Sequence, residues 1–409
     1  MGLEAQYGFT PRVYRKLVHA ATQGGSFAGA AEILEEQAEL VIGVKRLWRA
    51  VQRIGVERQA EEEAAAKAYE ELPLPAQQQS PVEQVPQVAC VQMDGGRLQI
   101  RDRHAPAQER AADASHWREL KAGALVSMHS QVHAQDPCPA LPASFADPGK
   151  MRQMAREIKG FTTAEEPAAQ AQASADEDAE AAATDRPGRP RPLVRSVGGV
   201  LGDIERFGPR LAAAAYARGF HAASRKAFLA DASEANWSVH ARWFSHYTPI
   251  VDFVHALMYV YAAALAGQTQ EAGWAVYRQW AQWLWSGDLP RLLAALAQRQ
   301  QELGPPAEKE TDTTRAEVAQ TLGYLTNQQS RMHYAEYRRQ GLPITSSYIE
   351  STIKQINRRM KGTEKFWSGG ANPMLTLVAD QLSETNVVPR FWTRRTARLV
   401  GQGCYHQAT

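Results

Sequence analysis

Residues 341–362 contain one carboxylate at the start of a helix whose later turns are basic. Gly341, Pro343 and a Ser/Thr cluster indicate a loop, and Gly362 is placed to end the helix that follows. An apolar stripe at helical spacing predicts that one face of this helix packs on a core, and its members are Ile349, Ile353, Ile356 and Met360. The chain must therefore build a core that holds this carboxylate, Glu350, at the helix start.

A second face of the same helix carries Glu350 followed by cations. One interpretation is local: Ser347 and Glu350 fit the S-x-x-E capping box, and Glu350 pairs with Lys354 one turn later. The other interpretation is a metal ligand followed by residues that contact DNA phosphates, and those residues are Lys354, Arg358, Arg359 and Lys361.

A second carboxylate, Asp94, follows a short apolar run at residues 88–93. Residues 95–96 are Gly-Gly, and an alternating run at 97–103 comes next, so we expect two strands joined by a Gly-Gly turn. A third strand is expected at residues 124–129. Asp94 then stands at the end of the first strand, although an Asp before Gly-Gly is ordinarily a turn former.

A third carboxylate, Asp231, follows a short buried strand expected at residues 226–230. Asp252 and His255 lie three residues apart in a helix expected from Pro249. Their spacing favours a structural hydrogen bond, but Asp252 remains an alternative to Asp231 as a metal ligand.

The N-terminal segment has a helix, a polar break and a second helix expected at residues 40–51, a pattern typical of a helix-turn-helix. The second helix presents Arg46 and Arg49 at helical spacing, suitable for DNA phosphates or a major groove. Arginines on a solvated helix face would give the same pattern, so both interpretations stay open.

Composition narrows the possible functions. The net charge of +2 does not mark a nucleic-acid binder, but residues 331–365 hold eight Lys or Arg against three Glu. Cys90, Cys138 and Cys404 lack C-x-x-C spacing, which argues against a zinc ribbon or a disulfide framework and suits a reducing cytoplasm. No apolar run is long enough to span a membrane, so we expect neither secretion nor a membrane partner.

The order strand, hairpin, strand, helix, strand, helix is that of an RNase H-like fold, in which such acids converge at one edge of the sheet. Three neighbouring carboxylates need counter-charge, and hard divalent ions with oxygen ligands supply it. We therefore expect Asp94, Asp231 and Glu350 to bind two Mg²⁺ or Mn²⁺ ions and to catalyse phosphoryl transfer.

Residues 331–368, RMHYAEYRRQGLPITSSYIESTIKQINRRMKGTEKFWS, resemble the segment around the last acid of the DDE transposases of bacterial insertion sequences, in the ISKra-like group. The D-G-G at Asp94, the strand-D-A-S at Asp231 and the D-x-x-H at Asp252 and His255 follow in that family's order. The resemblance implies catalytic and metal-binding roles for Asp94, Asp231 and Glu350, with D-x-x-H as a supporting motif.

The function implied is cleavage of element ends and joining of 3′-hydroxyls to target DNA. Expected partners are double-stranded DNA and at least one further copy of the chain, in a bacterial cytoplasm at the nucleoid. The alternatives are an RNase H-like nuclease without strand transfer and a domesticated DNA-binding protein without catalysis.

The expected organisation is an α/β protein whose mixed five-stranded sheet is flanked by helices, with an N-terminal helical domain and an all-helical insertion. The expected segments are an N-terminal helical domain at 1–72, a linker at 73–86, core at 87–135, a low-complexity, partly disordered insertion at 136–197, core at 198–255, the helical insertion at 256–340, closing core helices at 341–395 and a tail at 396–409.

Overall fold

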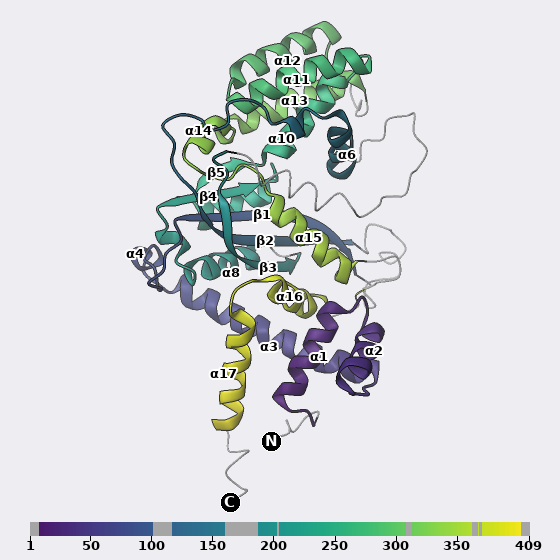
Figure 1. Ribbon diagram of the computed structural model, residues 1–409, viewed down its shortest axis with the longest axis vertical. Coiled ribbons are helices and arrows are strands. Elements are labelled where there is room, and N and C mark those ends of the chain that lie inside the picture. Colours follow the sequence, from purple (N-terminus) through teal and green to yellow (C-terminus); the bar gives the residue numbers. More distant parts are fainter. Residues whose placement is uncertain are drawn as a thin grey trace, which may run out of the picture.

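The computed structural model describes residues 8–100, 117–159, 187–202, 204–307, 313–361, 367 and 370–401. A mixed five-stranded sheet in the order β3-β2-β1-β4-β5 lies at the centre of the molecule. β1 pairs antiparallel with β2, and β2 pairs antiparallel with β3. On its other side β1 pairs parallel with β4, which pairs parallel with β5. The predicted α/β class with a mixed five-stranded sheet is therefore confirmed (Figure 1).

β1 (Val88–Gln99) and β2 (Trp117–His129) correct the predicted hairpin. Gly95 and Gly96 lie within β1, opposite Lys121 and Leu120 of β2, so they form no turn. The second strand was expected at residues 97–103, but the first three of these residues are the end of β1. The strand expected at 124–129 is the second half of β2. Gly-Gly resembles a turn in sequence, but here cross-strand pairing extends through both glycines.

β3 (Arg191–Leu201) corrects the prediction for residues 136–197. Its first half lies in the segment expected to be low-complexity and partly disordered, of which residues 160–186 are outside the described residues. Gly123 of β2 and Gly198 of β3 are register partners. A Cβ added to Gly123 would lie 3.0 Å from the rings and methyls of Phe207 and Leu211, so this glycine lets a helix pack closely on the sheet.

β4 (Arg225–Ala230) confirms the predicted buried strand, but β5 (Thr248–Val251) was missed. β5 has only four residues and contains Pro249, so it lacks the length and alternation of a recognisable strand. As a result the helix expected from Pro249 begins later, as α10 (Phe253–Leu265), and Asp252 is its N-cap.

Helices cover both faces of the sheet. α8 (Ile204–Tyr216) packs on β2 and β3, and it contacts α9 (Glu234–Trp243). On the other face α15 (Ser347–Met360) packs on β1 and β2, and α16 (Ala371–Leu382) packs on β3. Gly199 of β3 illustrates the second face, because a Cβ added there would contact Leu375 of α16.

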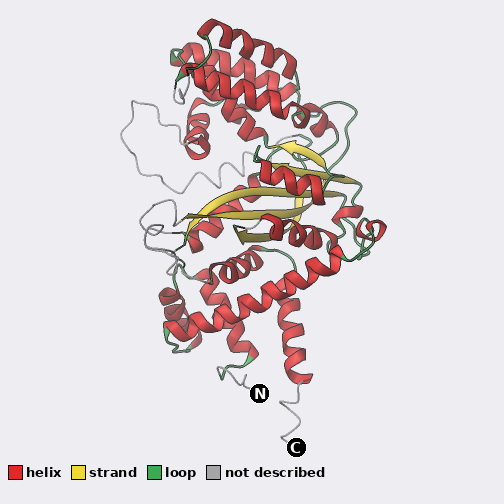
Figure 2. Cartoon of the chain, turned by 180° about the vertical axis from the view of Figure 1, so that it is seen from behind, coloured by secondary structure: helices red, strands yellow, loops and turns green. Residues whose placement is uncertain are grey.

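The N-terminal segment forms α1 (Pro11–Gln23), α2 (Phe27–Ala38) and α3 (Val44–Glu70). The helix expected at 40–51 thus begins later and is much longer, at 27 residues. α3 packs on both α8 and α16, and it is the long helix that runs diagonally below the sheet in Figure 2. Its buried Arg58 donates to both carboxylate oxygens of Asp380 at 2.6 and 3.0 Å. These helices are therefore packed into the core.

Between β5 and α15 the described residues form only helices, with a short 3-10 turn before α14. They are α10, α11 (Gln270–Ser286), α12 (Leu289–Leu303), α13 (Thr314–Gln328) and α14 (Tyr334–Arg339). α11, α12 and α13 lie at the end of the molecule opposite α1 and α17 (Figure 1). Tyr334 and Tyr337 of α14 donate to the carbonyls of Val251 and Pro249, which fixes α14 to β5.

The remaining helices are peripheral. α4 (Leu74–Gln77) lies in the expected linker, α6 (Pro148–Lys159) packs on α10, and α17 (Val387–Gly401) contacts α1 and α16. Among the described helices, none combines the length and the apolar character that crossing a bilayer requires.

Candidate active site

Three aspartates follow one another across the carboxyl edge of the parallel strands. The register aligns Met93 of β1 with Ala230 of β4, and Ala230 with Val251 of β5. The next residue in each strand direction is an acid, and these are Asp94, Asp231 and Asp252. Neighbouring parallel strands therefore present a row of carboxylates at one edge of the sheet.

Asp94 and Asp231 line one open pocket at this edge, together with Lys121 and Asn236. One oxygen of Asp94, Oδ1, accepts the backbone N–H of Gly95 at 2.6 Å. Oδ1 of Asp231 accepts the N–H of Ser233 at 2.9 Å and the side-chain amide of Asn236 at 2.8 Å. Among the described residues, the second oxygen of each acid has no hydrogen-bond partner, so both acids keep a possible ligand atom in the pocket.

Glu350 is held at the first turn of α15 by contacts to the sheet. Gln92, buried on β1 two residues before Asp94, accepts the N–H of Ile349 at 3.0 Å and donates to the carbonyl of Thr345. The Ser346 hydroxyl donates to Oε1 of Glu350 at 3.1 Å. Within the described chain Oε2 of Glu350 has no such partner.

The capping-box prediction is wrong in its register. The N-cap of α15 is Ser346, which makes no side-chain cap, and Ser347 is the first helical residue. Glu350 is thus one position too late for a capping box, and the backbone N–H of Ser346 is bound by Asp252 instead. Glu350 contacts the cap residue only through the Ser346 hydroxyl, at Oε1.

Asp252 is fully buried, and both of its oxygens are engaged by the protein. Oδ1 accepts the N–H of His255 at 2.8 Å and Nδ1 of the same residue at 3.1 Å. Oδ2 accepts the backbone N–H of Ser346. Asp252 therefore joins the start of α10 to the loop that carries Glu350, in agreement with the predicted hydrogen bond to His255.

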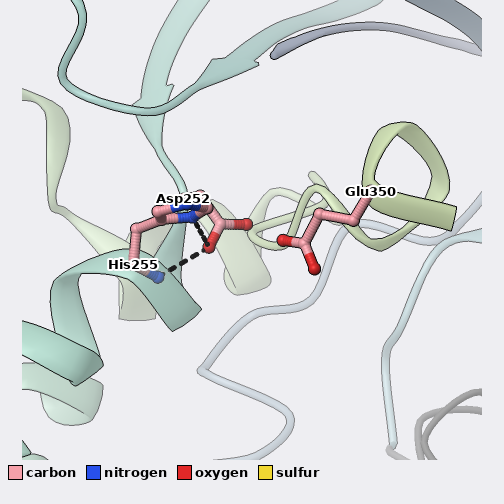
Figure 3. A group of neighbouring side chains, drawn as sticks. All are labelled: Asp252, His255 and Glu350. Carbon is pink, nitrogen blue, oxygen red and sulfur yellow. Dashed lines mark hydrogen bonds and ion pairs between the residues drawn. The ribbon is translucent and has the colours of Figure 1, made fainter. Parts of the chain in front are cut away.

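Asp252, His255 and Glu350 form a tight group in which one ligand atom of each lies within 4.8 Å of the others. Their side chains point toward one another from α10 and α15 (Figure 3). Burial alone would lower the pKa of His255, but the hydrogen bond and charge of Asp252 outweigh it and raise that pKa to about 9. A protonated imidazole has no lone pair for a metal, so at neutral pH this group is an ion pair.

The acids of the site are difficult to ionise together. Burial raises the pKa of Asp94 to about 6, and the charges of Asp231 and Asp252 contribute to the increase. Burial, with the charges of Asp252 and Asp94, raises the pKa of Glu350 to about 7. For Asp252 the contacts from His255 outweigh burial and lower its pKa. Such unfavourable negative charge is what a bound cation relieves.

The basic residues of α15 divide into two groups. Arg358 and Lys361 are exposed and Lys354 is half-buried, so all three can be reached from solvent. Arg359 is only 5% exposed, and its Nε donates to the carbonyl of Ala21 at 2.7 Å. The DNA contact predicted for Arg359 does not fit this burial, because its guanidinium joins α15 to α1.

Arg46 and Arg49 are exposed on the first turns of α3, and the guanidinium of Arg46 lies 4.5 Å from the ring centre of Phe9. Their predicted contact with DNA stays a prediction. They are on a helix integrated with the core, so they are positioned rigidly relative to the sheet.

Two residues that position the site, Gln92 and Ser346, were not identified from the sequence. Gln92 gave a signal, since a lone polar residue inside the apolar run 88–93 must find a partner when buried. Ser346 was hidden among several hydroxyl residues. Lys121, only 3% exposed yet lining the same pocket as Asp94, was given no role from the sequence.

Comparison with known protein families finds no family model that matches this chain. Comparison with curated proteins finds no match either.

Proposed function

We propose that this protein is a DDE transposase with an RNase H-like core that cleaves element ends and joins the released 3′-hydroxyls to target DNA. The observation that carries the proposal is the row of acids where the parallel pairing of β1 and β4 ends, beside α15, whose first turn carries Glu350. The strand order and directions support the RNase H-like assignment. β2 pairs antiparallel with both β1 and β3, and β4 and β5 run parallel to β1.

The donor set suits Mg²⁺ or Mn²⁺. Asp94, Asp231 and Glu350 each keep one carboxylate oxygen without a hydrogen-bond partner among the described residues, and hard divalent ions prefer such oxygens. We assign the ligand role to these three acids and a supporting role to Asp252 and His255. When bound, two divalent ions stabilise the attacking and leaving oxygens of an in-line phosphoryl transfer.

The protein's own residues supply position and charge. Asp252 accepts the N–H of Ser346 and Ser346 donates to Glu350, so the ion pair with His255 determines where Glu350 points. Lys354 and Arg358 follow Glu350 along α15, where they can bind phosphates on either side of the cleaved bond.

Cleavage hydrolyses one phosphate ester bond, whereas strand transfer exchanges one ester bond for another. In cleavage a water oxygen replaces the 3′-oxygen on phosphorus, and the departing 3′-oxygen takes up a proton. In strand transfer that 3′-hydroxyl attacks a target phosphate, its proton leaves, and the target's 3′-oxygen departs protonated. Two ends must be held together, so we propose at least a dimer on double-stranded DNA at the bacterial nucleoid.

The test is a product assay on DNA that contains the reading frame with its flanks, incubated with plasmid target and Mg²⁺. We expect nicked flanks and joined products from the wild-type chain, and neither from Asp94→Asn or Glu350→Gln. Cleaved but never joined products would indicate the nuclease alternative. Cleavage that persists undiminished in both variants would remove these acids from catalysis.

A further inference from the structure

A wide groove lies between α1 and α2 on one side and α16 and α17 on the other, away from the acids of the candidate site. It has a volume of about 800 Å³, and none of those acids lines it. α1 contacts both α16 and α17, and α16 in turn contacts α15 (Figure 1). The groove is therefore part of the folded body, on the same side of the sheet as the helix that carries Glu350.

One wall of the groove is the exposed face of α1, which carries basic side chains from residue 12 to residue 19. Three cations and one histidine recur at helical spacing and line the groove: Arg12, Arg15, Lys16 and His19. The opposite face of α1 is apolar and buried through Tyr14, Leu17 and Ala21. This helix is thus anchored by its apolar face and presents its cations in a fixed row.

The cations of α1 differ from four arginines of α8 and α17, which pair with glutamates of α3. Arg206 and Arg210 each donate to Glu63 at 2.5 Å, and Arg394 and Arg398 donate to Glu61 at 2.8 and 3.0 Å. None of the four α1 side chains has a carboxylate partner among the described residues. The glutamates of α3 thus neutralise the arginines around them, and the charge of α1 remains available to a ligand.

We propose that this face of α1 binds the sugar-phosphate backbone of duplex DNA. The row from Arg12 to His19 spans eight residues, or about 10 Å of helix, which matches two or three phosphates at about 3.4 Å per nucleotide of one strand. Among the described residues lining the groove the rings are those of His19 and of Trp392, which is only 7% exposed. No exposed Phe, Tyr or Trp among them offers a platform on which successive unpaired bases could stack, so the chemistry favours a duplex over a single strand.

The identity of this ligand rests on the proposed function, whereas the binding itself does not require catalysis. Phosphate contacts fix the orientation of a duplex without reading its sequence. The α1 face would then hold DNA beyond the segment that enters the site, and its loss would weaken binding to all sequences alike.

The test is the salt dependence of duplex binding, measured by fluorescence anisotropy with the full chain and a labelled duplex of arbitrary sequence. The triple variant Arg12→Gln, Arg15→Gln, Lys16→Gln should reduce the slope of log K against log salt by about 2 to 3, at about 0.9 per lost phosphate contact. The matched control is Arg206→Gln with Arg398→Gln, which removes exposed but paired arginines and should leave the slope unchanged.

Each outcome decides the inference. An unchanged salt slope in the folded triple variant would overturn the inference. An equal loss of slope in the control variant would also overturn it, and so would a loss of slope seen only with a single-stranded oligonucleotide. If the triple variant does not fold, Arg15→Gln and Lys16→Gln are measured singly, and each should lower the slope by about one. If the wild-type protein cleaves DNA but the triple variant keeps the wild-type salt slope of duplex binding, only this inference is rejected. If the triple variant loses salt slope but the wild-type protein cleaves no DNA, only the proposed function is rejected.

Discussion

Replacing Glu350 by glutamine should stabilise the metal-free protein at alkaline pH. The pKa of Glu350 is raised by burial from 4.5 to about 7, so the folded state holds this proton more tightly than the unfolded state. A carboxylate of this kind destabilises the fold progressively as the pH rises from about 4.5 to 7. Glutamine removes the charge and keeps nearly the same shape.

The magnitude follows from that pKa. Each pKa unit is worth about 1.4 kcal/mol, so full ionisation of Glu350 costs the metal-free fold about 3 kcal/mol. Part of this is offset, because the charge of Glu350 also helps to raise the pKa of His255 to about 9. We therefore expect Glu350→Gln to gain about 1 to 2 kcal/mol in unfolding free energy at pH 8, and almost nothing at pH 4.

The assay is urea unfolding in EDTA across pH 4 to 8.5, followed by circular dichroism. Glu336→Gln is the matched control, since the hydrogen bond from Arg339 lowers the pKa of Glu336 to about 2 and this pair is partly exposed. Its substitution should be neutral or slightly destabilising at pH 8. A Glu350→Gln chain that is no more stable than wild type at pH 8 would refute the reasoning about buried, mutually repelling acids.

Three further predictions concern metal, the sheet and the N-terminal helices. Mg²⁺ at ten times its dissociation constant should stabilise the wild type by about 1.4 kcal/mol in thermal unfolding, and should have little effect on Asp94→Asn. Gln92→Leu leaves two backbone groups of the α15 start without partners, so it should cost about 1 to 3 kcal/mol in urea unfolding. Asp380→Ala should cost about 3 kcal/mol by the same measurement, because the buried guanidinium of Arg58 loses both of its hydrogen bonds to Asp380 and keeps only the less buried Glu61 and Glu62. Asp380→Leu with Arg58→Met should cost less, because it removes the buried guanidinium together with its partner.

The helix with Glu350 and the buried strand before Asp231 could be predicted because each has a clear pattern of apolar residues within its own segment. The apolar stripe from Ile349 to Met360 has helical period, and all four of its members are buried in the structure. An isolated run of apolar residues likewise marked β4. Such signals need no knowledge of the rest of the chain.

The elements that were missed depend on pairing between distant segments. β5 is a strand because it pairs with β4, and β3 is a strand because it pairs with β2. Neither segment has a strong alternation of apolar and polar residues in its own sequence. The same limit applies to the site. The sequence predicted Asp94 at the end of a strand or in a turn, and both predictions are wrong. β2 pairs with β1 through Gly95 and Gly96, so Asp94 lies inside β1, at the point where the parallel pairing with β4 ends.

The most direct measurement compares Mg²⁺-dependent DNA cleavage by Asp231→Asn and Asp252→Asn, each titrated with Mg²⁺. Asp231 keeps an oxygen for a ligand, while both oxygens of Asp252 are held by His255 and Ser346. We predict that Asp231→Asn abolishes cleavage at every Mg²⁺ concentration, and that Asp252→Asn retains reduced cleavage with an unchanged Mg²⁺ requirement. Full activity of Asp231→Asn, together with loss of Mg²⁺ response in Asp252→Asn, would contradict the account.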